Sequence, residues 1–89
     1  MKTERVTLCN RLGLHARAAS KLVSTAAEFQ SNVMVVREDK RVNAKSIMGV
    51  LMLAAPVGTE LELVCDGPDA QAASDALVSL VEDRFGESE

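Results

Sequence analysis

The sequence has little aromatic character: it contains no tryptophan, no tyrosine and only two phenylalanines, Phe29 and Phe85. Single-stranded nucleic acids stack their bases on aromatic side chains, so this mode of binding is excluded. The chain also lacks an excess of basic residues, because 10 lysines and arginines stand against 13 aspartates and glutamates, giving a formal charge of −3. A protein that binds a phosphate backbone needs a basic surface, so nucleic acid is excluded as the main partner.

Cysteine and histidine are also scarce. The two cysteines, Cys9 and Cys65, lie far apart in the sequence, and His15 is the only histidine. A zinc site needs clustered cysteine and histidine ligands, which this chain does not provide. We therefore expect no metal and no other cofactor, and we expect both thiols to be reduced, half-buried and structural, each at the end of a strand.

Long apolar runs are absent as well. No window approaches the roughly 20 apolar residues that span a bilayer. The segment Met1–Arg5 lacks the apolar region of a secretory signal, so we expect a cytoplasmic protein that does not bind a membrane. The 89 residues suit a single domain, residues 1–89, that buries roughly 60–65% of the surface of its unfolded chain.

Hydrophobic patterning divides the chain into strands and helices. Apolar residues alternate with polar ones in the predicted strands, whereas Ala19, Leu22, Val23 and Ala26 recur at the spacing of one buried helical face. Ser46 and Asp69 are the predicted N-caps of the second and third helices, and Pro56 and Gly86 are expected to end them. The predicted strands are Thr3–Cys9, Asn32–Arg37, Arg41–Asn43 and Glu60–Cys65, and the predicted helices are Ala16–Ala27, Ile47–Ala55 and Ala70–Phe85.

The element order is therefore βαββαβα. The middle strands form a hairpin, because the polar segment Glu38–Lys40 between them is typical of a turn. This order predicts an α/β (α+β) fold, a two-layer open-faced sandwich with three helices on one face of a four-stranded antiparallel sheet.

His15 is the first candidate for chemistry, because it lies where the first strand gives way to a helix. The unpaired N–H groups at the start of that helix, together with Arg17, would surround an anion attached to the imidazole ring. No carboxylate neighbours His15 in the sequence, and Ser20 is too far along the helix to act as the nucleophile of a hydrolase.

Two motifs resemble the HPr family of bacterial histidine phosphocarriers. They are LGLHARAA at residues 12–19 and VNAKSIMG at residues 42–49. The resemblance implies that His15 takes a phosphoryl group on Nδ1 from phosphorylated enzyme I and passes it to a IIA-type acceptor, while Arg17 neutralises the phosphoryl oxygens. HPr proteins commonly have proline where this chain has Ala18, which leaves both the sugar-transport branch and the nitrogen-related regulatory branch open.

Ser46 is the second candidate. A serine at the start of a helix is expected as an N-cap on physical grounds alone. The resemblance adds a second role, since the matching serine in many HPr proteins is phosphorylated by an HPr kinase/phosphorylase. A phosphate at a helix N-terminus beside Lys45 is tolerated by the fold, so its effect would be on partner binding.

A small apolar patch with a basic rim is predicted next to these residues. Such a surface suits transient protein partners, while Val50 and Leu53 of the same helix are expected in the core. The patch consists of Ile47, Met48 and Leu51, ringed by Arg17, Lys21 and Lys45.

These observations predict a monomeric phosphocarrier that needs no metal and is a component of a phosphotransferase system rather than a stand-alone enzyme. Two alternatives belong to other classes. One is a regulatory interaction module that is not phosphorylated and binds partners through Met48. The other is an acylphosphatase-like enzyme that cradles phosphate with Arg17, which would leave His15 without a role.

Overall fold

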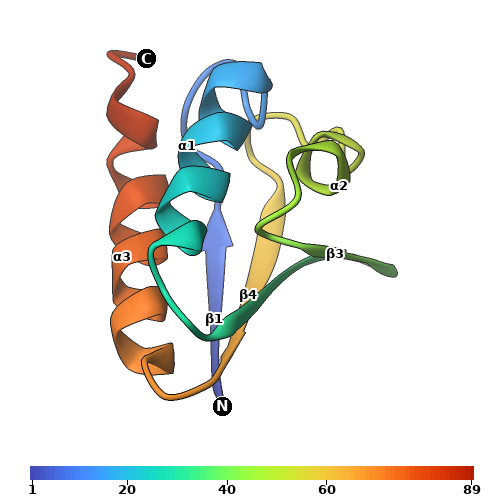
Figure 1. The fold of residues 1–89 in the computed structure, drawn as a ribbon. Coiled ribbons are helices and arrows are strands. Elements are labelled where there is room, and N and C mark those ends of the chain that lie inside the picture. Colours follow the sequence, from blue (N-terminus) through green and yellow to red (C-terminus); the bar gives the residue numbers. More distant parts are fainter.

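The computed structural model describes residues 1–89 and contains the strands and helices in the predicted order (Figure 1). None of its helices is long and apolar enough to cross a membrane. The elements are β1 (Lys2–Thr7), α1 (Ala16–Ala27), β2 (Asn32–Arg37), β3 (Lys40–Asn43), α2 (Ile47–Leu51), β4 (Glu60–Asp66), α3 (Ala70–Glu82) and a short 3-10 turn, η1 (Arg84–Gly86).

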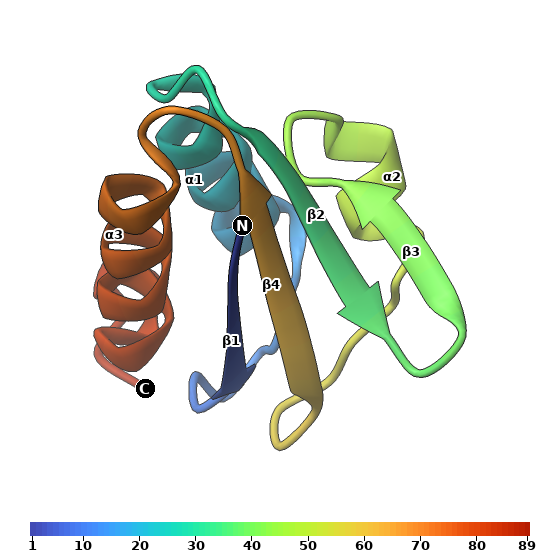
Figure 2. The same ribbon diagram turned by 90° about the horizontal axis from the view of Figure 1, so that it is seen from below.

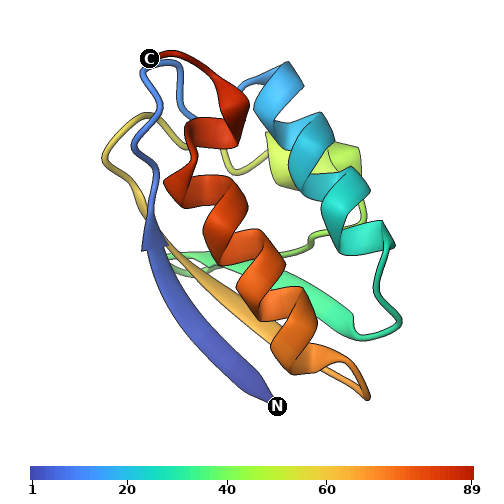
Figure 3. The same ribbon diagram turned by 90° about the vertical axis from the view of Figure 1, so that its left-hand side faces the viewer.

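The four strands form one antiparallel sheet in the order β1-β4-β2-β3, with β4 between β1 and β2 (Figure 2). The helices lie together on one side of this sheet, and the other side has no helix over it (Figure 3). The predicted open-faced α+β sandwich is therefore confirmed.

The core lies between the sheet and the helices. Alternation along β4 points Leu61, Leu63 and Cys65 inward, where they meet the apolar faces of α1 and α3, including Leu22 and Leu77. All five side chains are buried, and burying a leucine contributes roughly 1.5–3 kcal/mol to folding. This packing fixes the two long helices on the sheet.

The first strand ends earlier than predicted, at Thr7 instead of Cys9. Thr7 pairs with Glu60, the first residue of β4, so no partner strand remains for the residues that follow. Cys9 consequently lies in the next loop and is exposed, which corrects the prediction that it is half-buried at a strand end. Cys65 is fully buried and not half-buried as predicted, and it lies inside β4, which continues to Asp66.

The helix α2 is also shorter than predicted, because it ends at Leu51 instead of Ala55. Leu53 turns into the core and Ala54 has a positive φ of 50°, so the chain leaves the helical path before Pro56. The proline is therefore not what ends the helix.

The third long helix ends at Glu82, whereas the prediction extended it to Phe85. The following residues form η1, in which Arg84, Phe85 and Gly86 all have positive φ values of 53°, 55° and 78°. The fully buried Phe85 side chain anchors this turn to the core. The chain is thereby turned back toward the start of α1.

Asp69 occupies the predicted N-cap position of α3, but its side chain makes no capping hydrogen bond there. Its carboxylate accepts hydrogen bonds from the backbone N–H groups of Gln30 and Ser31, both at 2.9 Å, and from the Ser31 hydroxyl at 2.5 Å. Asp69 therefore ties the start of α3 to the loop that follows α1.

Candidate functional site

His15 is the N-cap residue of α1, in an extended conformation with φ −78° and ψ −179°. The preceding loop sets this position, because Gly13 has a φ of +66° and Leu14 donates its backbone N–H to the Ala55 carbonyl at 2.9 Å. A Cβ atom on Gly13 would lie 2.5 Å from the Ala55 carbonyl oxygen, so only glycine fits between these two loops.

The Nδ1 atom of His15 faces the start of α1. It accepts a hydrogen bond from the Arg17 backbone N–H at 3.3 Å, so this nitrogen carries a lone pair and not a proton. The first N–H groups of a helix lack partners within the helix and attract anions. An anion joined to Nδ1 would therefore lie among these donors.

The other ring nitrogen, Nε2, lies 2.5 Å from Glu87 Oε2. The Glu87 side chain is only 11% exposed and the His15 side chain 25%. The pKa of Glu87 is lowered, mainly because its carboxylate accepts a hydrogen bond from the Asn10 amide. The hydrogen bond with His15 and the charges of His15 and Arg17 lower it further, whereas partial burial opposes this shift. The ionised Glu87 carboxylate accepts a hydrogen bond from the protonated Nε2, which leaves Nδ1 without a proton.

Sequence reasoning missed Glu87, because it found no carboxylate beside His15. The two residues are 72 positions apart, and no periodic pattern links them. The contact depends on η1, where two consecutive non-glycine residues adopt left-handed conformations at a cost of roughly 1–2 kcal/mol each. Such strain clusters at functional sites and persists only where neighbouring contacts enforce it.

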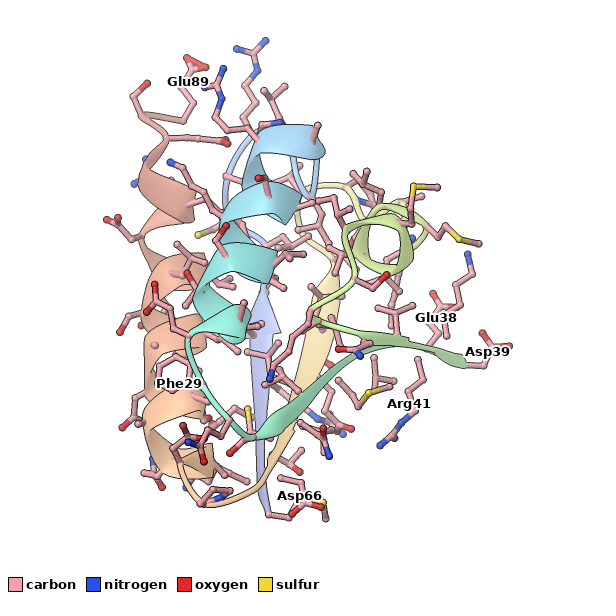
Figure 4. All side chains as sticks on the ribbon, in the orientation of Figure 1. Phe29, Glu38, Asp39, Arg41, Asp66 and Glu89 are labelled. Atoms are coloured by element: carbon pink, nitrogen blue, oxygen red, sulfur yellow. The ribbon has the colours of Figure 1, made fainter.

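Besides the contact between Glu87 and His15, several contacts hold the C-terminal segment Arg84–Glu89, which we call the C-terminal hook. Lys21 Nζ donates to the Phe85 carbonyl at 2.5 Å, and Arg84 donates to the Ser88 carbonyl at 3.2 Å. Arg11 forms an ion pair with Glu89 at 2.7 Å. Figure 4 shows Glu89 at the same end of the molecule as the start of α1.

A cavity of about 500 Å³ opens between the hook and α1. Arg11, Arg17 and Lys21 contribute three cationic side chains to its lining. The Arg17 side chain is exposed and makes no hydrogen bond or ion pair within the chain, whereas Arg11 and Lys21 are engaged with the hook. Arg17 is therefore the guanidinium available to an incoming anion.

Ser46 is the N-cap of α2, as predicted from the sequence, and its hydroxyl accepts a hydrogen bond from the Gly49 N–H at 3.2 Å. The residue is exposed, so the hydroxyl can be reached from solvent. Lys45 next to it points elsewhere, since its Nζ donates to the Phe29 carbonyl at 2.8 Å.

The predicted apolar patch lies on α2, beside α1 (Figure 1). Met48 is 66% exposed, Ile47 is also exposed, and Leu51 is half-buried. Sequence reasoning missed Met52 and Leu12, which are 70% and 64% exposed. Val50 and Leu53 lie in the core as predicted.

The fold and this arrangement define a class of protein: small α+β carriers that present one imidazole at a helix N-terminus beside an unpaired arginine. A family model described as "PTS HPr component phosphorylation site" matches residues 2–83. The chain therefore belongs to the HPr family, the phosphocarrier proteins of the phosphotransferase system.

Individual relatives agree with this assignment. The phosphocarrier protein HPr of Cupriavidus necator is 54% identical over 83 residues, which cover 93% of each chain. The phosphocarrier protein NPr of Shewanella violacea is 47% identical over 88 residues, covering 98% of this chain and 97% of that protein. A crystal structure of HPr from Thermoanaerobacter tengcongensis superposes with a TM-score of 0.97 at 43% identity over the full length of both chains. The acylphosphatase-like and interaction-module alternatives are therefore set aside.

Proposed function

We propose that His15 carries the phosphoryl group on Nδ1, accepting it from phosphorylated enzyme I and passing it to a IIA-type component. The Nδ1 lone pair forms a bond to phosphorus while the bond between phosphorus and the donor breaks, and its electron pair leaves with the donor. Transfer to the acceptor reverses these roles. The observation that carries this proposal is the orientation of the ring, with Nδ1 toward α1 and Nε2 on Glu87.

The helix N-terminus and Arg17 suit a group that must be received and then released. A helix dipole contributes roughly 0.3–1 kcal/mol to a nearby anion at an exposed site. An exposed guanidinium adds a charge-assisted hydrogen bond to the phosphoryl oxygens without enclosing them. The phosphoryl group is therefore held moderately, as a relay requires.

Incubation with phosphoenolpyruvate and enzyme I tests this proposal. The wild-type protein is expected to gain one phosphate that is labile in acid and stable in alkali, and His15→Ala is expected to gain none. Absence of labelling in the wild type, or labelling that persists in His15→Ala, would show that the proposed carrier residue is wrong.

Arg17→Ala provides a graded test of the same site. We expect this variant to take up the phosphoryl group roughly 10- to 100-fold more slowly than the wild type. The effect is expected to be smaller than the loss of a donor from an enclosed oxyanion hole, because Arg17 is exposed to solvent. Arg11→Ala is the matched control, since the Arg11 guanidinium is already paired with Glu89. Initial rates with enzyme I as the donor measure both, and equal slowing in the two variants contradicts the role of Arg17.

The partner surface is proposed to be the apolar patch around Met48, extended by Met52, with Arg17 as its available cation. Methionine side chains are flexible and suit transient binding to more than one partner. Lys21 and Lys45, which the sequence placed on the rim, each bind a carbonyl oxygen, so their proposed partner role is weaker than that of Arg17. Ile47 and Leu51 complete the apolar part of this surface.

Ser46 is proposed as a regulatory phosphorylation site for an HPr kinase/phosphorylase. Its exposed hydroxyl and its place beside the patch support this proposal. With the kinase and ATP, an acid-stable phosphate is expected on the wild type and on Ser20→Ala, an exposed serine of α1, but not on Ser46→Ala. Labelling that persists in Ser46→Ala would refute the assignment.

The protein is further proposed to act as a cytoplasmic monomer. Its exposed apolar patch is of the small kind that transient partners use. A dimer has been solved for an HPr of Thermoanaerobacter tengcongensis that is 44% identical and has a TM-score of 0.79. Sedimentation equilibrium separates the two states, and a stable dimer at micromolar concentration would contradict the monomer.

A further inference from the structure

Asn10 has a place in the site that its sequence position does not suggest. The residue is fully buried in the loop before His15. Its Nδ2 group donates one hydrogen bond to the Gly13 carbonyl at 2.7 Å and one to Glu87 Oε1 at 3.0 Å. Both partners are acceptors only, so they fix the amide with its NH₂ group toward them.

The Glu87 carboxylate is shared between Asn10 and His15. Its Oε1 atom accepts from Asn10, and its Oε2 atom lies against His15 Nε2. One buried amide therefore sets the position of the carboxylate that binds the histidine ring. The left-handed turn of the hook brings Glu87 within reach of both.

We propose that Asn10 and Glu87 are positioning residues for His15, in which the Asn10 amide holds the Glu87 carboxylate and this carboxylate keeps the ring proton on Nε2. The inference rests on the proposed role of His15 as the phosphoryl carrier. It adds the chain of contacts that keeps the Nδ1 lone pair free to attack.

The location of the ring proton during the transfer supports this arrangement. When Nδ1 bonds to phosphorus, the ring retains its proton on Nε2 and becomes positively charged. The Glu87 carboxylate pairs with that charge, so no proton has to be lost to solvent. When the phosphoryl group leaves, the electron pair returns to Nδ1 and the ring becomes neutral with its proton still on Nε2.

The test uses ¹⁵N NMR of the imidazole in the unphosphorylated protein, which reports the protonation of each ring nitrogen directly. The wild type is expected to show protonated Nε2 and unprotonated Nδ1. Glu87→Ala removes the acceptor, and Asn10→Asp places a second carboxylate against Glu87. Both variants are expected to give a mixture of tautomers and roughly tenfold slower phosphoryl uptake, because the hydrogen bonds that they remove involve a charged group.

Glu89→Ala is the matched control, since it breaks the ion pair with Arg11 and leaves both contacts of Glu87 intact. It is expected to keep the wild-type tautomer and rate. Slower uptake in Asn10→Asp with an unchanged tautomer would assign Asn10 to loop stability alone and overturn the proposal, as would a wild-type tautomer in Glu87→Ala.

If Asn10→Asp fails to fold, the side-chain amide resonances of Asn10 provide a second measurement. They are expected to shift in Glu87→Ala and to stay in place in Glu89→Ala, and no shift in Glu87→Ala would overturn the proposal. The tautomer is measured in the unphosphorylated protein. A failure of this inference can therefore be distinguished from a failure of His15 to accept a phosphoryl group.

Discussion

The two nitrogens of His15 have different surroundings because they face different parts of the chain. Nδ1 faces the start of α1, and Nε2 faces the C-terminal hook. The sequence predicted His15 and Arg17 as site residues because both lie in one short motif at a helix start. It did not predict Glu87 or the proposed role of Asn10, because their contacts join segments from opposite ends of the chain.

The two cysteines are predicted to differ in reactivity. Cys65 is fully buried, and burial raises the pKa of its thiol, with a further contribution from the Asp69 carboxylate. Cys9 is exposed in the loop after β1. Because the thiolate is the reactive form, iodoacetamide at pH 8 is expected to add one group to the native protein, at Cys9.

Mass spectrometry counts these adducts and peptide mapping locates them. In denaturant both cysteines are expected to react, which serves as the control. Two adducts formed at equal rates in the native protein would contradict the placement of Cys65 in the core.

At the scale of elements, the site depends on a turn before α1 and a turn after α3. Periodicity predicted the helices and strands themselves, since their apolar faces follow regular spacings. It could not predict where β1 ends, because that depends on the start of β4. The hook was missed for a related reason, since its left-handed residues carry no sequence pattern and are held by Lys21 and by the burial of Phe85.

Gly13→Ala is predicted to destabilise the protein more than Gly58→Ala. Both glycines have a positive φ, of 66° and 87°, so each substitution costs roughly 1–2 kcal/mol in backbone conformation. Only at Gly13 does the new Cβ meet backbone atoms, 2.5 Å from the Ala55 carbonyl oxygen. We expect a total of about 2–5 kcal/mol for Gly13→Ala, because overpacking adds about 1–3 kcal/mol to the conformational cost.

Urea denaturation of the two variants measures the difference. Gly58 has nothing within 4 Å of the added atom, so it isolates the conformational cost. Equal losses of stability in the two variants would contradict the close contact between the loop before α1 and the segment after α2.

At the scale of the whole molecule, one carboxylate links the loop after α1 to the start of α3. Hydrogen bonds from the Ser31 hydroxyl and from the backbone of Gln30 and Ser31 lower the pKa of Asp69. In the unfolded chain an aspartate has a pKa of about 3.9. The folded value lies below this, so the stabilisation is complete above pH 5 and is lost as the pH falls below about 4.

Asp69→Asn is therefore predicted to be less stable than the wild type at pH 7, and the difference between their free energies of unfolding is predicted to shrink as the pH falls below about 4. Urea denaturation at several pH values measures this difference. Asp75→Asn is the control, because Asp75 makes only an exposed contact with Gln71 within α3. If the difference in free energy of unfolding between Asp69→Asn and the wild type stays constant with pH, the charge of Asp69 does not stabilise the fold.

The whole molecule combines a rigid core with one chemical group at its surface. The sheet and the long helices hold the start of α1 in place, and the hook closes over one side of His15. Under the proposed function no pocket that encloses a substrate is needed, because a partner protein would bring the phosphoryl group to the exposed side of the ring.

The site of attachment on the ring tests the central claim most directly. After phosphorylation by enzyme I, ³¹P and ¹⁵N NMR of the protein labelled at histidine identifies the nitrogen that is bonded to phosphorus. We predict that this nitrogen is Nδ1 of His15, with a proton on Nε2. A phosphoryl group on Nε2, or on any other residue, would contradict the account.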